Sequence, residues 1–242
     1  YRELNLNIPY GPVSAKVNNK VEGLNYRLYH NKDIEFLGLD SASGMRAYTR
    51  SLFFVLCKAV NDLYPEGKVV IDIPVSNGYY CDLRIGREVA DKDVKAIRKR
   101  MEEIVKAAIP IRRHEAPAED AIRMFEEMGA ESKVSLLKSI GNLYTTYYTI
   151  DDYKDYYYGT MLTNTSQLSV FGLEKYYDGM LLRTPTRQNP NELGALIRQD
   201  KMFEIFKEHH RWQQILGIDT VGVFNQAVMK GWTNDIVNIS EA

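Results

Sequence analysis

The sequence predicts an α+β fold built around antiparallel sheets. Strand-like runs and helical patterns follow one another in the order β-β-α-β-α-α, which differs from the strict alternation of a doubly wound sheet. Asn-Gly joins the β-rich runs Val69–Val75 and Tyr79–Ile85, and this pair is the preferred chemistry of a tight hairpin turn. With 242 residues and 45% hydrophobic content, the chain can bury a large core.

Three short strands are predicted before this hairpin. The β-rich runs Val13–Asn18, Leu24–Leu28 and Asp33–Leu37 are separated by the turn-forming pairs Asn18-Asn19 and Asn31-Lys32. They indicate a small β-rich unit at the start of the chain.

Two long helices are predicted on either side of the hairpin. The first follows Gly44, which we expect to break the chain, and it ends at Pro65. The second begins at Asp91, which we expect to cap its N-terminus. Each has apolar residues at helical spacing, which makes the first helix mostly buried and gives the second an apolar face.

Shorter elements fill the rest of the chain. A strand at Ile109–His114 is followed by helices at Ala118–Met128 and Ser132–Ile140. Polar residues between Pro185 and Pro190 indicate a linker to an amphipathic helix, and another helix begins at Asp219-Thr220. Four β-rich runs before the linker complete an antiparallel sheet: Tyr144–Ile150, Asp155–Tyr158, Gln167–Phe171 and Lys175–Leu182.

Composition argues against several classes of protein. The 31 basic and 32 acidic side chains are interleaved, so bulk charge gives no support for nucleic-acid binding. No run approaches the roughly 18 apolar residues of a membrane span, and no secretory signal is visible, so we expect a cytoplasmic protein without membrane contact. Cys57 and Cys81 lie in apolar segments and are expected to be buried thiols. The chain begins at Tyr1 and ends within a helical pattern, so we expect a longer parent protein.

The stretch Arg50–Leu83 resembles a known family. It contains Arg-Ser-Leu-Phe-Phe, then Leu-Tyr-Pro, then Asn-Gly-Tyr-Tyr-Cys-Asp-Leu. This resembles the editing domain of threonyl-tRNA synthetases, where His-Ser-x-x-His opens a helix ending in Leu-Tyr-Pro and a hairpin carries Asn-Gly-Phe-Tyr-Tyr-Asp-Phe. The resemblance runs from about Gly44 to Thr184. Residues 15–36 resemble the latter half of the TGS domain, a ubiquitin-like β-grasp.

The resemblance implies a site whose ligands are lost. Arg50 and Phe54 occupy the two histidine positions, while Tyr157 and Met161 align with the cysteine and histidine of Asp-Leu-Cys-x-Gly-Pro-His. A zinc site needs about four nitrogen, sulfur or oxygen ligands. We therefore expect no catalytic residue, no metal and no cofactor here. The former editing cleft is expected to be lined by Arg50, Phe54, Tyr80, Asp82, Tyr157 and Met161, and a filled, structural cleft is favoured over a retained small-molecule pocket.

The C-terminal residues resemble a second family. Asp200–Lys207, Glu208–Trp212, Ile218–Gly222 and Phe224–Val228 resemble the connector of long bacterial uridine kinases, in which TGS-like and synthetase-like regions precede a P-loop kinase. No phosphate-binding loop with its lysine occurs in this sequence. The resemblance thus implies ATP and magnesium for a kinase domain downstream, which would be the partner of this region. A homo-oligomer is left open.

Three parts are expected: residues 1–40 as a partial TGS-like β-grasp, 41–190 as the editing-like domain, and 191–242 as a helical connector to the kinase. The resulting hypothesis is a non-catalytic regulatory or structural region of a kinase that transfers phosphate from ATP to uridine or cytidine. The alternatives are a zinc-independent tRNA-editing hydrolase, with Asp82 or Asp72 positioning water, and a tRNA-binding adaptor.

Some aromatic and histidine residues permit two interpretations. His114 is expected at an exposed strand end, with anion contact as the alternative. His209-His210 is expected on a packed linker helix, because adjacent histidines on a helix point apart and make a weak metal site. A tyrosine-rich run predicts sheet core and cross-strand pairs, with a base-stacking platform as the alternative. Its members are Tyr144, Tyr147, Tyr148, Tyr153, Tyr156, Tyr157 and Tyr158.

Overall fold

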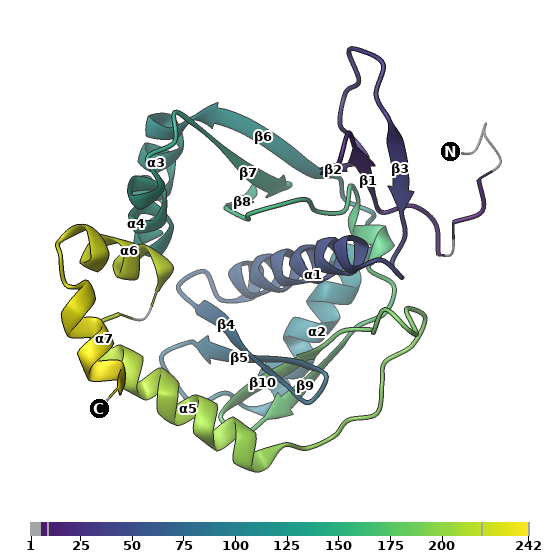
Figure 1. Cartoon of the computed structure of the whole chain (residues 1–242). Coiled ribbons are helices and arrows are strands. Elements are labelled where there is room, and N and C mark those ends of the chain that lie inside the picture. Colours follow the sequence, from purple (N-terminus) through teal and green to yellow (C-terminus); the bar gives the residue numbers. More distant parts are fainter. Residues whose placement is uncertain (1–5, 9, 219, 242) are drawn as a thin grey trace. The chain divides into compact units, whose positions relative to one another are not determined.

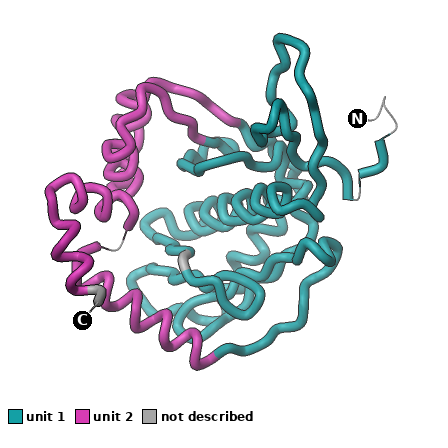
Figure 2. The backbone as a smooth tube through the Cα atoms, viewed as in Figure 1, with its two compact units in different colours: residues 1–112, 148–199 teal, residues 113–147, 200–242 magenta. Residues whose placement is uncertain are grey.

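The computed structural model describes residues 6–8, 10–218 and 220–241, apart from the side chains of Asp72, Ser240 and Glu241 (Figure 1). It confirms the predicted α+β class with antiparallel sheets. Two compact units are present, one formed by residues 1–112 and 148–199, the other by residues 113–147 and 200–242 (Figure 2). The predicted three-part division stays a prediction.

The first sheet is a small three-stranded one with the order β2-β1-β3. Its strands are β1 (Ser14–Val17), β2 (Lys20–Gly23) and β3 (Ile34–Leu37). Asn18 and Asn19 both have positive φ, 45° and 67°, which gives the two-residue turn that suits the twist of a hairpin. Pairing therefore resumes directly after Asn19, and the predicted strand at Leu24–Leu28 is wrong.

The second sheet has four antiparallel strands in the order β4-β5-β10-β9. They are β4 (Lys68–Val75), β5 (Gly78–Arg84), β9 (Gly172–Tyr176) and β10 (Gly179–Arg183). The β4–β5 turn is Ser76-Asn77, with φ of 54° and 57°, so Gly78 already belongs to the strand. Glycine is required there because a Cβ atom would lie 2.5 Å from the Leu182 carbonyl oxygen.

Two other strand predictions in this region are wrong. The predicted strand Lys175–Leu182 is instead the hairpin of β9 and β10, which turns at Tyr177 with a φ of 47°. The predicted strand Gln167–Phe171 is a short 3-10 helix, η1 (Thr165–Gln167), followed by irregular chain. Asn164 caps this helix by accepting a hydrogen bond from the backbone of Ser166 at 2.9 Å, which removes that segment from strand pairing.

Helices α1 (Ala42–Leu63) and α2 (Asp91–Lys106) pack against each other and against the four-stranded sheet. The core of this unit includes residues of both helices together with Cys81, Leu173 and Met180 of the sheet. α1 begins two residues before Gly44, so the expected chain break at that glycine is wrong.

The start of α1 is determined by its cap and by close packing. The Ser41 hydroxyl accepts a hydrogen bond from the Gly44 backbone at 3.0 Å, which satisfies an otherwise unpaired N–H. A Cβ atom at position 44 would lie 2.0 Å from the carbonyl oxygen of Gly38. Gly44 therefore allows the first turn of α1 to pack closely against the backbone at Gly38, and it does not bend the chain.

The start of α2 depends on Asp93 rather than on Asp91. Ala90 is the N-cap residue, and one carboxylate oxygen of Asp93, in the first turn, accepts a hydrogen bond from the Ala90 backbone at 2.9 Å, so the capping role predicted for Asp91 is wrong. The same carboxylate accepts two hydrogen bonds from Arg87, at 2.7 and 2.8 Å, and one from the Tyr64 hydroxyl at 3.0 Å. This network joins the end of α1 to the start of α2.

The remaining elements include a third sheet with the order β6-β7-β8. Its strands are β6 (Ile111–Pro117), β7 (Tyr144–Ile150) and β8 (Tyr153–Asp155). The predicted strand Asp155–Tyr158 is wrong, because β8 ends at Asp155. Asp151 turns the chain with positive φ, so pairing with β7 already starts at Tyr153. The other helices are α3 (Ala118–Glu127), α4 (Glu131–Ile140), α5 (Asp200–Ile215), α6 (Val221–Met229) and α7 (Thr233–Glu241).

Within the second unit, α4 and α6 approach closely at Gly222, where a Cβ atom would lie 2.6 Å from the Leu136 backbone nitrogen. Thr220 caps α6 with its hydroxyl, as expected of a helix starting at this point. None of the helices in the described ranges combines the length and apolar character that a membrane crossing requires.

The substitution Asp93→Asn should lower the free energy of unfolding at pH 7 by about 1–3 kcal/mol, since it weakens hydrogen bonds to a buried, charged acceptor. Hydrogen bonds from Arg87 hold the pKa of Asp93 well below its ordinary value, so ionised Asp93 stabilises the fold above the unfolded-state pKa. Stability from this source is lost as the pH falls below about 4. Urea unfolding at pH 7 and pH 3 measures both effects.

The control is Asp91→Asn, which changes an exposed carboxylate in the same helical turn. It should leave stability within about 0.5 kcal/mol of the original protein. An equal effect of the two substitutions would contradict the role given to Asp93.

Candidate functional site

Four of the predicted cleft residues lie in one region along α1. Phe54 is fully buried, and its ring centroid lies 5.4 Å from that of Tyr157 and 5.6 Å from that of Tyr153. Met161 is buried in the same hydrophobic core, and Arg50 contacts the residue before it. Three of the positions aligned with family ligands are thus filled by apolar and aromatic packing in the core, and Arg50 lies beside them.

Tyr157 adds a polar contact to this packing. Its hydroxyl donates to the Cys57 sulfur at 3.8 Å. Burial is the main cause that raises the pKa of Tyr157 well above 10, and burial raises the pKa of Tyr153 as well. Both phenols therefore stay protonated near neutral pH.

The loop after β8 is held to α1 and to β7 by hydrogen bonds. One guanidinium nitrogen of Arg50 donates to the Thr160 carbonyl at 2.6 Å, and the Tyr148 hydroxyl donates to the Gly159 carbonyl at 2.7 Å. Gly159 has a φ of 101°, and a Cβ atom there would lie 2.9 Å from the Arg50 guanidinium carbon. Burial lowers the pKa of Arg50, and the charge of Arg46 adds to this effect. The arginine thus has a structural contact in the place of a metal ligand.

The other two predicted cleft residues lie on the opposite face of the sheet. Successive strand residues point to opposite faces. In β5, Tyr79 packs on Phe53 of α1 with ring centroids 4.8 Å apart, so Tyr80 and Asp82 point away from this helix. The Tyr80 hydroxyl donates to an oxygen of Asp178 at 2.6 Å.

Asp82 itself forms an ion pair with Arg84 at 2.8 Å. The structure therefore does not bring Asp82 together with Arg50. Asp72, the other proposed water-positioning residue, has a side chain outside the described part of the chain.

The remaining candidates serve mainly in packing. His114 stacks on Tyr147 with ring centroids 5.0 Å apart and planes at 14°. Among the tyrosines, Tyr148 is buried while Tyr158 is 86% exposed, so the run does not present one uniform surface. Cys57 is half-buried, unlike the fully buried Cys81, and both are free thiols.

The histidine pair on α5 does not gather metal ligands. His210 contacts the Gln214 side chain at 3.0 Å through a ring nitrogen. Across the described residues, no group of three or more His, Cys, Asp or Glu side chains is placed to hold a metal ion.

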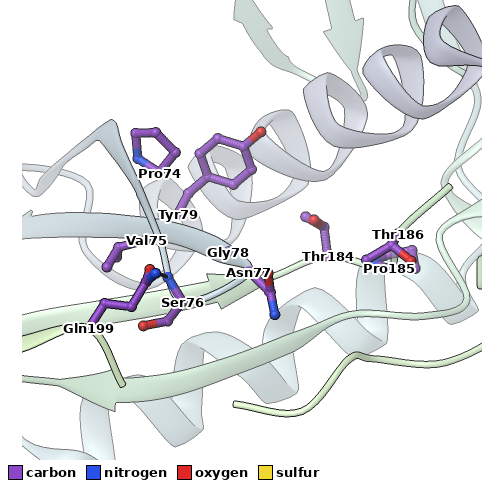
Figure 3. A pocket seen from close by; sticks show the side chains of 10 residues that line it. All are labelled: Pro74, Val75, Ser76, Asn77, Gly78, Tyr79, Thr184, Pro185, Thr186 and Gln199. Carbon is purple, nitrogen blue, oxygen red and sulfur yellow. Dashed lines mark hydrogen bonds between the residues drawn. The ribbon is translucent and has the colours of Figure 1, made fainter. Parts of the chain in front are cut away.

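A cavity of about 330 Å³ lies beside the β4–β5 turn (Figure 3). Gln199 contributes its side-chain oxygen, which accepts a hydrogen bond from the Ser76 backbone at 2.9 Å. None of the ten lining residues is charged, so this cavity offers little chemistry. They are Pro74, Val75, Ser76, Asn77, Gly78, Tyr79, Thr184, Pro185, Thr186 and Gln199.

A second cavity, of about 420 Å³, lies beside the first half of α1. Its lining includes Arg46, Arg50 and Arg187, of which sequence reasoning identified only Arg50. The four-residue spacing of Arg46 and Arg50 places them on one helix face and could have indicated the pair. Arg187 comes from the linker between the prolines, and no local pattern connects it with α1. We call this the arginine cavity; it is lined by Ala42, Met45, Arg46, Thr49, Arg50, Phe53, Tyr79 and Arg187.

Comparison with known proteins shows which scaffold carries these residues. The chain is 31% identical over 164 residues to a threonine–tRNA ligase of Acidithiobacillus ferrooxidans, a match covering 67% of this chain and 26% of the ligase. It is similar to a region of threonine–tRNA ligases. The ligase of Methylobacillus flagellatus is 30% identical over 178 residues, which cover 72% of this chain and 28% of that protein. The ligase of Natranaerobius thermophilus is 36% identical over 119 residues, which cover 49% of this chain and 19% of that protein.

This similarity supports the predicted threonyl-tRNA synthetase editing-like domain. The chain spans only about a quarter of the length of the first ligases that it matches. No family model matches the chain. The uridine kinase parent, its ATP and magnesium, and the partner assignments stay predictions.

The substitution Phe54→Ala should lower the free energy of unfolding by about 3–5 kcal/mol, because it removes a fully buried ring and leaves a cavity. Leu63→Ala is the matched control on the same helix, since Leu63 is 39% exposed. Chemical denaturation of both variants measures the difference. A cost below about 1 kcal/mol for Phe54→Ala would contradict a closely packed site at this position.

Proposed function

We propose that this chain is an editing-like domain that acts by binding and by placing neighbouring domains, without hydrolysing aminoacyl-tRNA. The observation that carries the proposal is the packing at three of the four positions aligned with editing ligands, where Phe54 and Met161 are buried and Tyr157 contacts Cys57. Similarity to threonine–tRNA ligases supports the scaffold. Scaffold similarity by itself does not carry a reaction.

Hydrolysis needs a group that activates water, either a metal ion or a general base. The four positions offer a guanidinium, a phenyl ring, a phenol and a thioether. A guanidinium stays protonated in proteins, and burial keeps the Tyr157 phenol protonated. These side chains therefore supply neither metal ligands of the usual kind nor a base near neutral pH.

The zinc-independent hydrolase is disfavoured by the geometry of β5. Asp82 points away from α1 and is paired with Arg84, so it is poorly placed to orient water beside Arg50. A binding role needs no such group. A binding role also agrees with the positively charged cavity beside α1.

Deacylation of seryl-tRNA(Thr), the mischarged substrate of an editing hydrolase, tests this proposal. With and without added zinc, we expect the rate with this protein to equal the uncatalysed rate. The ligase of Acidithiobacillus ferrooxidans serves as a positive control for the assay. Deacylation above background that is abolished by Asp82→Asn would instead establish the hydrolase.

A second candidate concerns the longer protein. The resemblance of residues 200–228 to the connector of uridine kinases supports a regulatory or structural role beside an ATP- and magnesium-dependent kinase domain. Removal of residues 1–184 from the longer protein should then change its stability, assembly or regulation while uridine phosphorylation stays measurable. Complete loss of turnover in a well-folded truncation would contradict this role.

A further inference from the structure

The arginine cavity brings positive charge together from two distant parts of the chain. Arg46 and Arg50 come from neighbouring turns of α1, and Arg187 comes from the linker that follows β10. Thr49 adds a hydroxyl between the two helical arginines. The eight lining residues include three guanidinium groups and no carboxylate.

This charge is not neutralised within the described residues. None of the three arginines forms an ion pair with a carboxylate there. Arg46 donates to the Ser43 hydroxyl at 3.0 Å and Arg50 donates to the Thr160 carbonyl, so each uses only part of its five N–H donors. An anion in the cavity would therefore find donors that still lack a charged acceptor.

Repulsion between Arg46 and Arg50 also favours binding of an anion. The charge of Arg46 contributes, after burial, to the lowered pKa of Arg50. Two like charges held close together with one partly desolvated are unfavourable, and a bound anion would relieve that cost. The positive end of α1 adds to the field, because Ala42 begins the helix and lines the cavity and no acidic residue occupies the first turn.

The cavity also has an aromatic side. The rings of Phe53 and Tyr79 meet edge to face with centroids 4.8 Å apart, and both residues line the cavity. Its volume of about 420 Å³ falls within the usual range of small-molecule sites, about 300–1,000 Å³. Aromatic surface beside guanidinium groups suits a ligand with both an anionic and a planar part.

We propose that the arginine cavity binds the phosphate group of a nucleotide, with Arg46 and Arg187 as its principal ligands, Arg50 as a supporting charge, and Phe53 and Tyr79 beside the base. Phosphate fits better than a carboxylate because three guanidinium groups match a dianion and its several acceptor oxygens. The inference deepens the proposed binding role and rests on it, but it concerns side chains to which the editing motifs assign no function, Arg50 excepted.

Calorimetric titration at constant ionic strength tests the proposal with three probes: inorganic pyrophosphate, AMP, and a short RNA ending in Cyt-Cyt-Ade. The decisive variant is Arg46→Ala with Arg187→Ala, both at exposed positions outside the core. We expect saturable binding of at least one probe to the original protein. The Kd should rise roughly tenfold or more in the double variant, since two charge-assisted contacts are lost.

The control removes the same charge elsewhere through Arg98→Ala with Arg123→Ala, which are surface arginines paired with Glu102 and Asp120. It should leave the Kd within about twofold of the original, as bulk charge is equal in both variants. Arg46→Lys with Arg187→Lys should restore part of the affinity. A bound probe should also raise the Tm of the original and control proteins by more than that of the double alanine variant.

The probes also distinguish the sources of the phosphate. Tighter binding of AMP than of RNA indicates a free nucleotide, and the reverse indicates an RNA end; either result supports the proposal. Absence of saturable binding for every probe, or equal weakening in the control variant, overturns it. Acetate at equal ionic strength should not compete, and full competition by acetate would also overturn the choice of phosphate.

The outcome is separable from that of the proposed function. If the protein deacylates seryl-tRNA(Thr) and still binds AMP through Arg46 and Arg187, the non-hydrolytic role fails while this site stands. If it neither deacylates nor binds a phosphate probe, this site fails alone.

Discussion

The burial of α1 is the constraint on which the rest of this structure depends. Apolar residues along nearly its whole length lie in the core, where the helix packs on α2 and on the four-stranded sheet. Even Lys58 is buried, and its ammonium group is neutralised by Asp62 at 3.0 Å and Asp152 at 3.2 Å. Burying a charge is costly unless it is paired, and the ion pair to Asp152 connects the neighbouring β7–β8 turn with the helix.

That burial also accounts for the side chains at the positions that the resemblance aligns with editing ligands. A metal site at Phe54, Tyr157 and Met161 would have needed polar ligands inside the core. Aromatic and thioether side chains occupy these positions and contribute hydrophobic stabilisation instead. These three side chains are part of the core, and Arg50 holds the loop backbone through Thr160.

The outer side of the same helix has a different character. Its first half carries Arg46 and Arg50 beside a cavity that the hydrophobic core does not fill. α1 therefore joins a closed apolar interior at Phe54 to a positively charged, accessible surface one or two turns earlier. Such a surface suits binding without hydrolysis, because recognition of an anion needs charge and shape but no activated water.

Local sequence determined the α+β class and the position of α1 and α2, since helical periodicity can be seen in neighbouring residues. Arg50, Phe54, Tyr157 and Met161 were indicated by the resemblance to the editing domain, and their role stays a prediction. Tertiary structure decided the β9–β10 hairpin, because its turn at Tyr177 requires left-handed backbone that tyrosine does not favour, whereas Asn18-Asn19 indicates its own turn. It also placed Tyr80 and Asp82 on the far side of the sheet, and it brought Arg187 to Arg46. Contacts between residues so distant in the chain arise only when the sheet and helices pack together, so no local pattern contains them.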